Sequence, residues 1–294
     1  MSSTGKRFGV IVGVDGSPAS DAAVAWAARD AATRGTALTL MHADSPATPT
    51  WAQAAELEDL AGWQEAQGRT ILENAAKIAR DAVDTSSPLQ INGELFLSPT
   101  VPTLVDRSVD ADLIVVGTDG RGALKRGLLG SVSSGLVRHA HCPVGVIHDE
   151  HLQIPDLAAA PVLVGIDGST SDLATAIAFE EASRRGVDLI ALHAWSDVDM
   201  DAIPGYDWTP VTEKEDRLLT EALSGWQERH PDVTVDKRLV SDHAAHALIK
   251  TSESAQLVVV GSHGSGAFAG MLLGSVSNAI VQSIRRPVIV ARMS

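Results

Sequence analysis

The chain has 294 residues, a length that fits two domains of about 150 residues each. Hydrophobic residues make up 45% and charged residues 20%, which is typical of a globular protein. The formal net charge of −14 excludes a protein that holds nucleic acid or anionic lipid over a broad surface. An anionic ligand would therefore be held by local geometry rather than by the overall field.

The composition also indicates the cellular compartment. Cys142 is the one cysteine of the sequence, so no intrachain disulfide can form, and we expect a reducing environment. The opening residues Met1–Phe8 contain no apolar segment of the secretory kind. No apolar run approaches the roughly 18 residues of a membrane-spanning helix. We therefore expect a cytoplasmic protein without membrane insertion.

The first half of the chain alternates apolar runs with helical patterns. Ser17 is a predicted helix N-cap with Pro18 at the first helical position, and Gly35 is predicted to end that helix. In chain order the expected elements are strand Phe8–Val14, helix Ala19–Arg34, strand Leu38–Ala43, helix Glu56–Val83, strand Leu89–Leu97, helix Val101–Val109, strand Leu113–Val116, helix Ser131–His139 and strand Pro143–Ile147.

The second half repeats this order. Its expected elements are strand Val162–Ile166, helix Ser171–Arg185, strand Leu189–Ala194, helix Lys214–Gln227, strand Val233–Val240, helix Ala244–Ser252, strand Leu257–Val260, helix Ser275–Ile284 and strand Pro287–Val290. Strands that alternate with helices predict an α/β fold with a parallel sheet and right-handed crossovers. A doubly wound sheet of five such strands takes the order 3-2-1-4-5, with helices on both faces.

The two halves are copies of one another. Between Leu113–Val146 and Leu257–Val290, 17 of 34 positions are identical. The sequence VGVDGS at the front of the first copy returns as VGIDGS in the second. Such self-similarity indicates a tandem duplication. With the joint near residues 148–160, we predict two domains, 1–150 and 151–294.

A glycine-spaced loop follows the fourth strand of each copy. Gly117 and Gly120 are separated by nine residues from Gly130 and Ser131, and the same spacing recurs with Gly261, Gly264, Gly274 and Ser275. The following helix begins with free N–H groups and a partial positive charge, which suit phosphate, and glycines allow close approach. Ser131 and Ser275 are predicted N-caps, with the hydroxyls of Ser133 and Ser277 near the same phosphates. The alternative, that these loops are merely tight turns, is weakened because the spacing occurs twice.

Two familiar phosphate-binding motifs do not fit. The pattern GxxxxGK[ST] is absent, and no lysine stands at the helix start, which argues against a P-loop NTPase. A dinucleotide fingerprint would follow the first strand, where Gly13 and Gly16 do not make GxGxxG. In a sheet ordered 3-2-1-4-5, Asp15 and Gly117 instead face each other across the switch point. The Asp15 carboxylate would repel phosphate and better accept a hydrogen bond from an adenine amine or a ribose hydroxyl. The alternative for Asp15 and Asp167 is a local Asx-turn.

These loops and the paired VGVDGS and VGIDGS segments resemble the ATP-binding branch of the universal stress protein family, in its tandem, actinobacterial form. The resemblance covers almost the whole chain. It implies two flavodoxin-like or Rossmann-like domains, one ATP site per domain, a homodimer, and a regulatory role in survival under stress or dormancy.

Carried over onto this sequence, the resemblance implies that residues at the strand ends and in the loops contact the nucleotide. Val14 and Ile166 would line the adenine, and Ala43 and Ala194 would contact the base through their backbone. The full implied set is Val14, Asp15, Ala43, Gly117, Gly120, Arg121, Gly130, Ser131, Val132 and Ser133 in the first copy, and Ile166, Asp167, Ala194, Gly261, Gly264, Gly274, Ser275, Val276 and Ser277 in the second.

The two loops differ in charge. The first carries Arg121, Lys125 and Arg126, whereas the second carries no cation except the nearby His263. These cations are either phosphate ligands or solvated loop charges. If they face phosphate, the first domain holds ATP more tightly.

No catalytic constellation can be assigned in either copy. Histidines 139 and 141 lack counterparts in the second copy, so we expect no metal site there, and His42 and His193 are expected to be buried strand-end histidines. We therefore expect a binding protein that takes ATP, with or without Mg²⁺, and a regulatory protein partner. A weak ATPase or an autophosphorylating enzyme is the first alternative, and a scaffold that binds no nucleotide is the second.

Overall fold

A computed structural model describes residues 8–45, 57–84, 88–118, 120, 129–148, 157–168, 172–195, 207–264 and 272–292. The chain divides into two compact units. The first comprises Met1–Leu152 with the last two residues, and the second comprises Gln153–Arg292.

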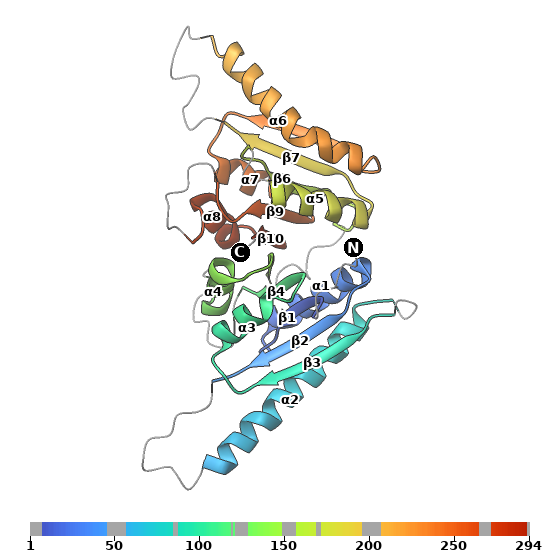
Figure 1. Ribbon diagram of the computed structural model, residues 1–294, viewed down its shortest axis with the longest axis vertical. Coiled ribbons are helices and arrows are strands. Elements are labelled where there is room, and N and C mark those ends of the chain that lie inside the picture. Colours follow the sequence, from blue (N-terminus) through green and yellow to red (C-terminus); the bar gives the residue numbers. More distant parts are fainter. Residues whose placement is uncertain are drawn as a thin grey trace. The chain divides into compact units, whose positions relative to one another are not determined.

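Five parallel strands form the sheet of the first unit, in the order β3-β2-β1-β4-β5 (Figure 1). This is the predicted order 3-2-1-4-5. The strands are β1 (Val10–Gly13), β2 (Leu38–Ala43), β3 (Ile91–Phe96), β4 (Leu113–Gly117) and β5 (Val144–Ile147). The helices are α1 (Pro18–Arg34), α2 (Leu57–Asp81), α3 (Thr100–Ser108) and α4 (Ser131–His139).

The second unit repeats the arrangement in the order β8-β7-β6-β9-β10, again with parallel pairing. Its strands are β6 (Val162–Gly165), β7 (Leu189–Ala194), β8 (Val235–Val240), β9 (Leu257–Gly261) and β10 (Val288–Ala291). Its helices are α5 (Asp172–Arg185), α6 (Thr209–Arg229), α7 (Ala244–Ser252) and α8 (Ser275–Ser283).

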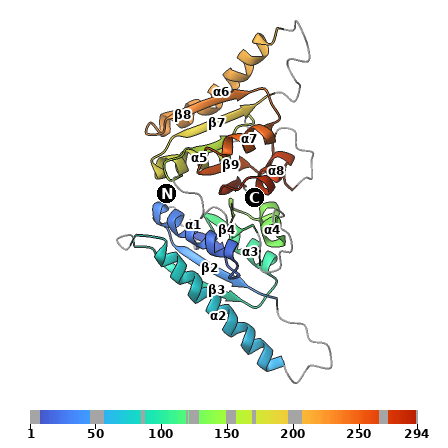
Figure 2. The same ribbon diagram turned by 180° about the vertical axis from the view of Figure 1, so that it is seen from behind.

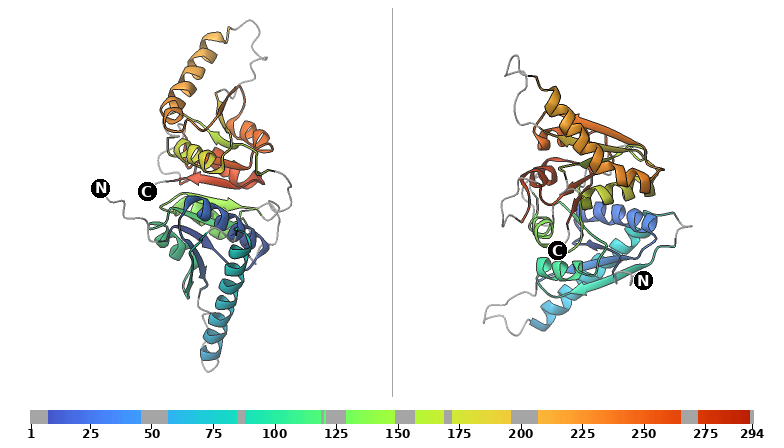
Figure 3. Two further views of the ribbon diagram at one scale, coloured as in Figure 1. Left: turned by 90° about the vertical axis from the view of Figure 1, so that its right-hand side faces the viewer. Right: turned by 45° about the horizontal axis from the view of Figure 1, so that its top comes forward.

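Helices cover both faces of each sheet. Within the first unit α1 packs against α2 and α3 packs against α4, and in the second unit α5 packs against α6 and α7 against α8 (Figures 2 and 3). The right-handed crossover rule accounts for this. Connections that run from β1 toward β3 place their helices on one face, and the return to β4 and β5 places the next helices on the other.

The core lies along the central strands. Val10 and Val12 are fully buried because both faces of β1 are covered. Helix α1 is rich in alanine and comes close to the sheet, so that a Cβ added at Gly117 would lie 2.6 Å from the carbonyl carbon of Ala19. Cys142 is buried as a small apolar side chain. Among the described residues no helix is long and apolar enough to cross a membrane.

Several predicted boundaries are corrected. Phe8 lies outside β1 because Gly9 adopts a left-handed φ of 60° before the strand begins. Helix α6 begins at Thr209, earlier than the predicted Lys214, and Pro210 in its first turn is the start signal that the prediction missed. The N-cap role of Ser17 and the left-handed Gly35 at the end of α1 are confirmed.

Candidate functional site

The end of β1 is organised by a network of hydrogen bonds at the start of α1. The backbone N–H and the hydroxyl of Ser17 donate to Asp15 Oδ1 at 2.9 and 2.6 Å. Ser17 Oγ accepts from the backbone N–H of Ser20 at 3.2 Å, and Ser20 Oγ accepts from the N–H of Asp15 at 3.2 Å. Oδ1 of Asp15 therefore forms the Asx-turn that the sequence left open, and this turn fixes the direction of the carboxylate.

The second oxygen of Asp15 faces the glycine loop. A Cβ added at Gly120 would lie 2.8 Å from Asp15 Oδ2. In the second domain a Cβ at Gly264 would overlap Asp167 Oδ2. Each copy thus brings its aspartate and the second glycine of its loop together at the carboxyl ends of the first and fourth strands. This is the switch point, where ligands of doubly wound sheets bind.

Each glycine loop is tied at its base. The N–H of Gly130 donates to the carbonyl of Thr118 at 2.7 Å, and that of Gly274 donates to the carbonyl of Ser262 at 2.8 Å. The buried hydroxyl of Ser133 donates to the carbonyl oxygens of Thr118 and Gly130, at 3.1 and 3.0 Å. These bonds place the start of α4 beside the end of β4.

The predicted N-cap roles of Ser131 and Ser275 are wrong. Gly130 and Gly274 are the N-caps, with extended backbone, and Ser131 and Ser275 are the first helical residues. The hydroxyl of Ser277 donates to the carbonyl of Gly261 at 2.5 Å, so it holds the loop as Ser133 does. Within the described residues no side chain caps α4 or α8, which leaves N–H groups of the first turn for an anion.

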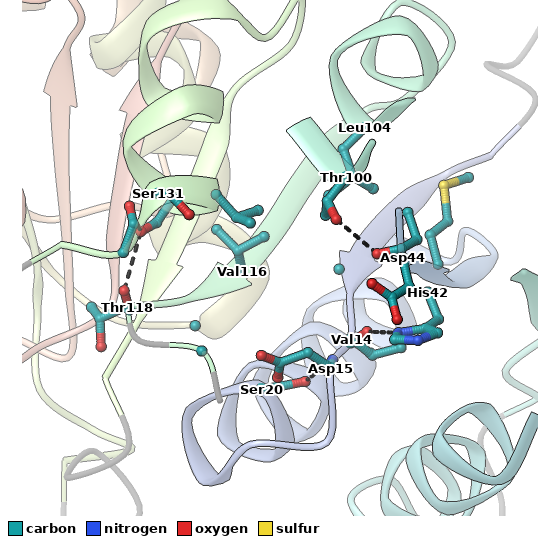
Figure 4. A pocket seen from close by; sticks show the side chains of 18 residues that line it. Val14, Asp15, Ser20, His42, Asp44, Thr100, Leu104, Val116, Thr118 and Ser131 are labelled. Carbon is teal, nitrogen blue, oxygen red and sulfur yellow. Dashed lines mark hydrogen bonds between the residues drawn. The ribbon is translucent and has the colours of Figure 1, made fainter. Parts of the chain in front are cut away.

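A cavity of about 270 Å³ lies between these features in the first domain (Figure 4). The strand ends, the loop base and the first turn of α4 supply its walls. The predicted residues that line it are Val14, Asp15, Ala43, Gly117, Gly120, Gly130, Ser131, Val132 and Ser133. Arg121, together with Lys125 and Arg126, lies outside the described residues.

Half of the residues that line the cavity were not predicted from the sequence. The additional residues are Gly13, Ser20, Met41, His42, Asp44, Thr100, Leu104, Val116 and Thr118. Most flank a predicted residue at a strand end. Thr100 and Leu104 differ, because they belong to α3, and the Thr100 hydroxyl donates to the carbonyl of Ala43 at 2.7 Å. Only the packing of α3 against the end of β2 brings both residues to the cavity.

The predicted residues of the second domain occupy the matching positions. Ile166 and Asp167 follow β6, Ala194 ends β7, and Gly261 ends β9. The remaining predicted residues are Gly264, Gly274, Ser275, Val276 and Ser277, around the entry to α8.

The two strand-end histidines are buried, as expected. His42 Nδ1–H donates to the carbonyl of Val14 at 2.6 Å, and His193 Nδ1–H donates to that of Ile166 at 2.8 Å. Both histidines therefore hold the second strand of the unit to the end of the first. Among the described residues no group of three or more His, Cys, Asp or Glu side chains is placed to hold a metal ion.

The β1 side of the cavity is negatively charged. Burial raises the pKa of the Asp21 carboxyl above its ordinary value, and the nearby Asp15 carboxylate raises it further. Two neighbouring carboxylates disfavour phosphate at this side. Phosphate is better placed at the start of α4, across the cavity from Asp15 (Figure 4).

The raised pKa of Asp21 predicts that a substitution at this position changes stability by an amount that depends on pH. In the unfolded chain this carboxyl titrates near its ordinary value of 3.8, whereas the folded protein holds the proton to a higher pH. Its ionisation therefore lowers stability as pH rises above 3.8. We expect Asp21→Asn to be more stable than the native chain at about pH 7, with a smaller difference at about pH 4. Urea midpoints at both pH values measure this, and a difference that grows toward acid would contradict it.

Ser17 is expected to support both helix α1 and the orientation of Asp15. Ser17→Ala removes the N-cap bond and one of the two bonds to Asp15 Oδ1, so we expect a loss of about 1 kcal/mol in the free energy of unfolding. Ser17→Thr keeps the hydroxyl and serves as the control. Chemical denaturation of both variants provides the measurement, and equal losses would show that the cap bond contributes little.

The fold and the candidate site define a tandem α/β protein with a cavity at the switch point of its first sheet. Comparison with known proteins agrees with this class. A model of the universal stress protein family matches residues 9–148 and 160–292. The chain therefore belongs to the universal stress protein family.

Its relatives share this architecture over their full length. A universal stress protein of Mycobacterium bovis is 55% identical over 295 residues, covering 100% of both chains. A universal stress protein of Mycobacterium tuberculosis is 52% identical over 295 residues, covering 100% of this chain and 99% of the relative. The crystal structure of a universal stress protein from Archaeoglobus fulgidus has a TM-score of 0.72 at 20% identity, covering 97% of this chain and 98% of that chain.

Proposed function

We propose that each domain binds one molecule of ATP and that the nucleotide controls a regulatory role in adaptation to stress or dormancy. The observation that carries this proposal is the cavity of the first domain. It combines a helix start that no described side chain caps with a carboxylate, Asp15, across the same space. The first suits phosphate, and the second suits a ribose hydroxyl or a base amine. Membership in the family supports the stress-related role.

Further parts of the proposal follow the same reasoning. Mg²⁺ would accompany the triphosphate and partly neutralise it, because a protein with a net charge of −14 does not attract a triphosphate through its overall field. A cytoplasmic homodimer that contacts a regulatory protein is the proposed working form. The sequence places no lysine at the start of either α4 or α8. This favours holding ATP over hydrolysing it.

The experiment is direct measurement of bound nucleotide. Full-length protein is purified, its nucleotide is extracted and identified by mass, and ATP binding is then titrated with and without Mg²⁺. We expect ATP as the ligand, with saturation at one molecule per domain. No binding at about 1 mM ATP would reject the proposal in favour of a nucleotide-independent scaffold.

Autophosphorylation is the second candidate, favoured by a Ser–His pair in the second loop. Ser262 Oγ and His263 Nδ1 are hydrogen-bonded at 3.1 Å. In this step Ser262 Oγ would form a bond to the γ-phosphorus, ADP would leave, and His263 would take the hydroxyl proton. Incubation with γ-labelled ATP tests it. Label that Ser262→Ala abolishes would favour it, and an unlabelled chain would reject it.

A further inference from the structure

Three oxygen groups line the first-domain cavity on the side across from Ser131, the first residue of α4 (Figure 4). They are the carbonyl of Ala43, the hydroxyl of Thr100 and the carboxylate of Asp44. Thr100 Oγ1 gives its single proton to the carbonyl of Ala43 at 2.7 Å. Its oxygen can then only accept a further hydrogen bond. All three groups therefore present acceptors, and this wall favours a ligand that donates.

The second domain lacks two of these acceptors. Its equivalent positions follow from the hydrogen bonds: the N–H of Asp44 donates to Phe96 at 3.0 Å, and that of Trp195 donates to Val240 at 3.2 Å, in both cases at the carboxyl end of the third strand. Trp195 thus stands where the first domain has Asp44.

The hydroxyl of Thr100 is also missing from the second domain. Thr100 is the first residue of α3, and the first residue of α7 is Ala244. Trp195 packs against Trp208 with ring centroids 6.0 Å apart and an interplanar angle of 56°. The second domain has therefore replaced two acceptors by a methyl group and an indole.

The position of the base follows from the charges, and this step rests on the proposed function. Phosphates lie at the uncapped start of α4, because the carboxylates of Asp15 and Asp44 repel them from the opposite side. A nucleotide in this orientation directs its base toward Ala43 and Thr100. Figure 4 shows Thr100 and Ser131 on opposite sides of the cavity, and the hydrogen bond of Thr100 places the Ala43 carbonyl beside it.

We propose that Thr100 makes the first domain selective for a purine with an amino group at position 6, whereas the second domain tolerates either purine. The 6-amino group of adenine donates to the acceptor wall. The 6-oxo group of hypoxanthine places an acceptor against the buried carbonyl of Ala43 and the half-buried hydroxyl oxygen of Thr100, so neither receives a hydrogen bond from the base. An indole offers its face to any base, whatever hydrogen bonds that base makes.

ATP and ITP form the test pair, because they differ in the base around position 6 and share the ribose and phosphates. Both measurements use the full chain. The first domain is measured in the Gly264→Val variant, in which the second site is closed, and the second domain is measured in the Gly120→Val variant, in which the first site is closed. We expect the first domain to prefer ATP by about tenfold or more and the second to bind both within about threefold.

Three further variants assign the effect to the hydroxyl. Thr100→Val keeps the shape, and we expect it to reduce the preference of the first domain to within about threefold. Thr103→Val is the control, because the Thr103 hydroxyl donates to the carbonyl of Pro99 at 2.7 Å and does not line the cavity. Ala244→Thr is expected to raise the ATP preference of the second domain.

The outcomes separate this inference from the proposed function. Equal preferences in the two domains, or a preference that Thr100→Val leaves unchanged, would overturn the inference while ATP binding stands. If neither ATP nor ITP binds to the Gly264→Val chain or to the Gly120→Val chain, the proposed function and the inference are both rejected. Should Thr100→Val fail to fold, Ala244→Thr decides, and an unchanged ratio in the second domain then overturns the role of the hydroxyl.

Discussion

Replacing Glu181 with alanine is expected to lower the free energy of unfolding of the second domain by about 3 kcal/mol. Glu181 lies in α5, and its side chain is 1% exposed. The carboxylate accepts from Arg184 Nη2 at 2.5 Å and from Arg185 Nε at 2.9 Å. Without it, two guanidinium groups with side chains only 24% and 18% exposed lose their shared partner. Removing a buried carboxylate from two partly buried cations is costly even though Arg184 keeps Glu180 and Arg185 keeps Gln256, so the loss exceeds that of a surface pair.

The neighbouring Glu180 supplies the matched control. Its side chain is 50% exposed, and it meets Arg184 Nη1 at 3.3 Å. We expect Glu180→Ala to change the free energy of unfolding by less than about 1 kcal/mol, because exposed pairs contribute little. Urea denaturation followed by far-UV circular dichroism measures both variants. Similar losses in the two would show that the burial of Glu181 is not what matters.

The order of the strands could be predicted because each one carries its own signal. The short runs around Val12, Val115, Val164 and Val259 are apolar on both faces, as central parallel strands must be. For the doubly wound order 3-2-1-4-5, the crossover rule then fixes which face of the sheet each helix covers. The edges of elements were harder to predict. The left-handed backbone of Gly9 delays the start of β1 to Val10, and the neighbouring residues do not reveal this angle.

The glycines and Asp15 of the site were found because their spacing is a local property of the chain. Thr100 was not, since its relation to Ala43 joins residues 57 positions apart. The N-cap prediction for Ser131 was also wrong. A serine at a helix start is a common N-cap, but here Gly130 takes that position, and the hydroxyl of Ser133 turns back to close the loop.

The duplication also hides differences between the two candidate sites. The spacing from the first strand to the loop differs between the copies, so the strand-end residues cannot be paired by one constant shift. Matching hydrogen bonds at the ends of β3 and β8 pair Asp44 with Trp195. The two candidate sites share their glycines and aspartates but differ in the groups expected to face the nucleotide base. Their ligand preferences need not be the same.

Replacing Gly120 with valine is expected to remove ATP binding from the first domain and leave it intact in the second. A Cβ at this position would lie 2.8 Å from Asp15 Oδ2, and the two methyl groups of valine add to the overlap. Asp15 cannot move away without breaking its bonds to Ser17. The side chain therefore enters the space between the carboxylate and the loop. Titration of the full chain with ATP should saturate at half the native stoichiometry.

Gly264→Val is the reciprocal variant, since a Cβ there overlaps Asp167 Oδ2. It should remove the other half of the binding, and the double variant should bind none. Gly93→Val is the control, because a Cβ at Gly93 on the exposed part of β3 has nothing within 4 Å. Unfolding midpoints of all variants accompany the titrations. If the loops were only tight turns, Gly120→Val would lower stability without changing the amount of ATP bound. A halved stoichiometry at native stability would instead identify the gap between Asp15 and Gly120 as part of the nucleotide site.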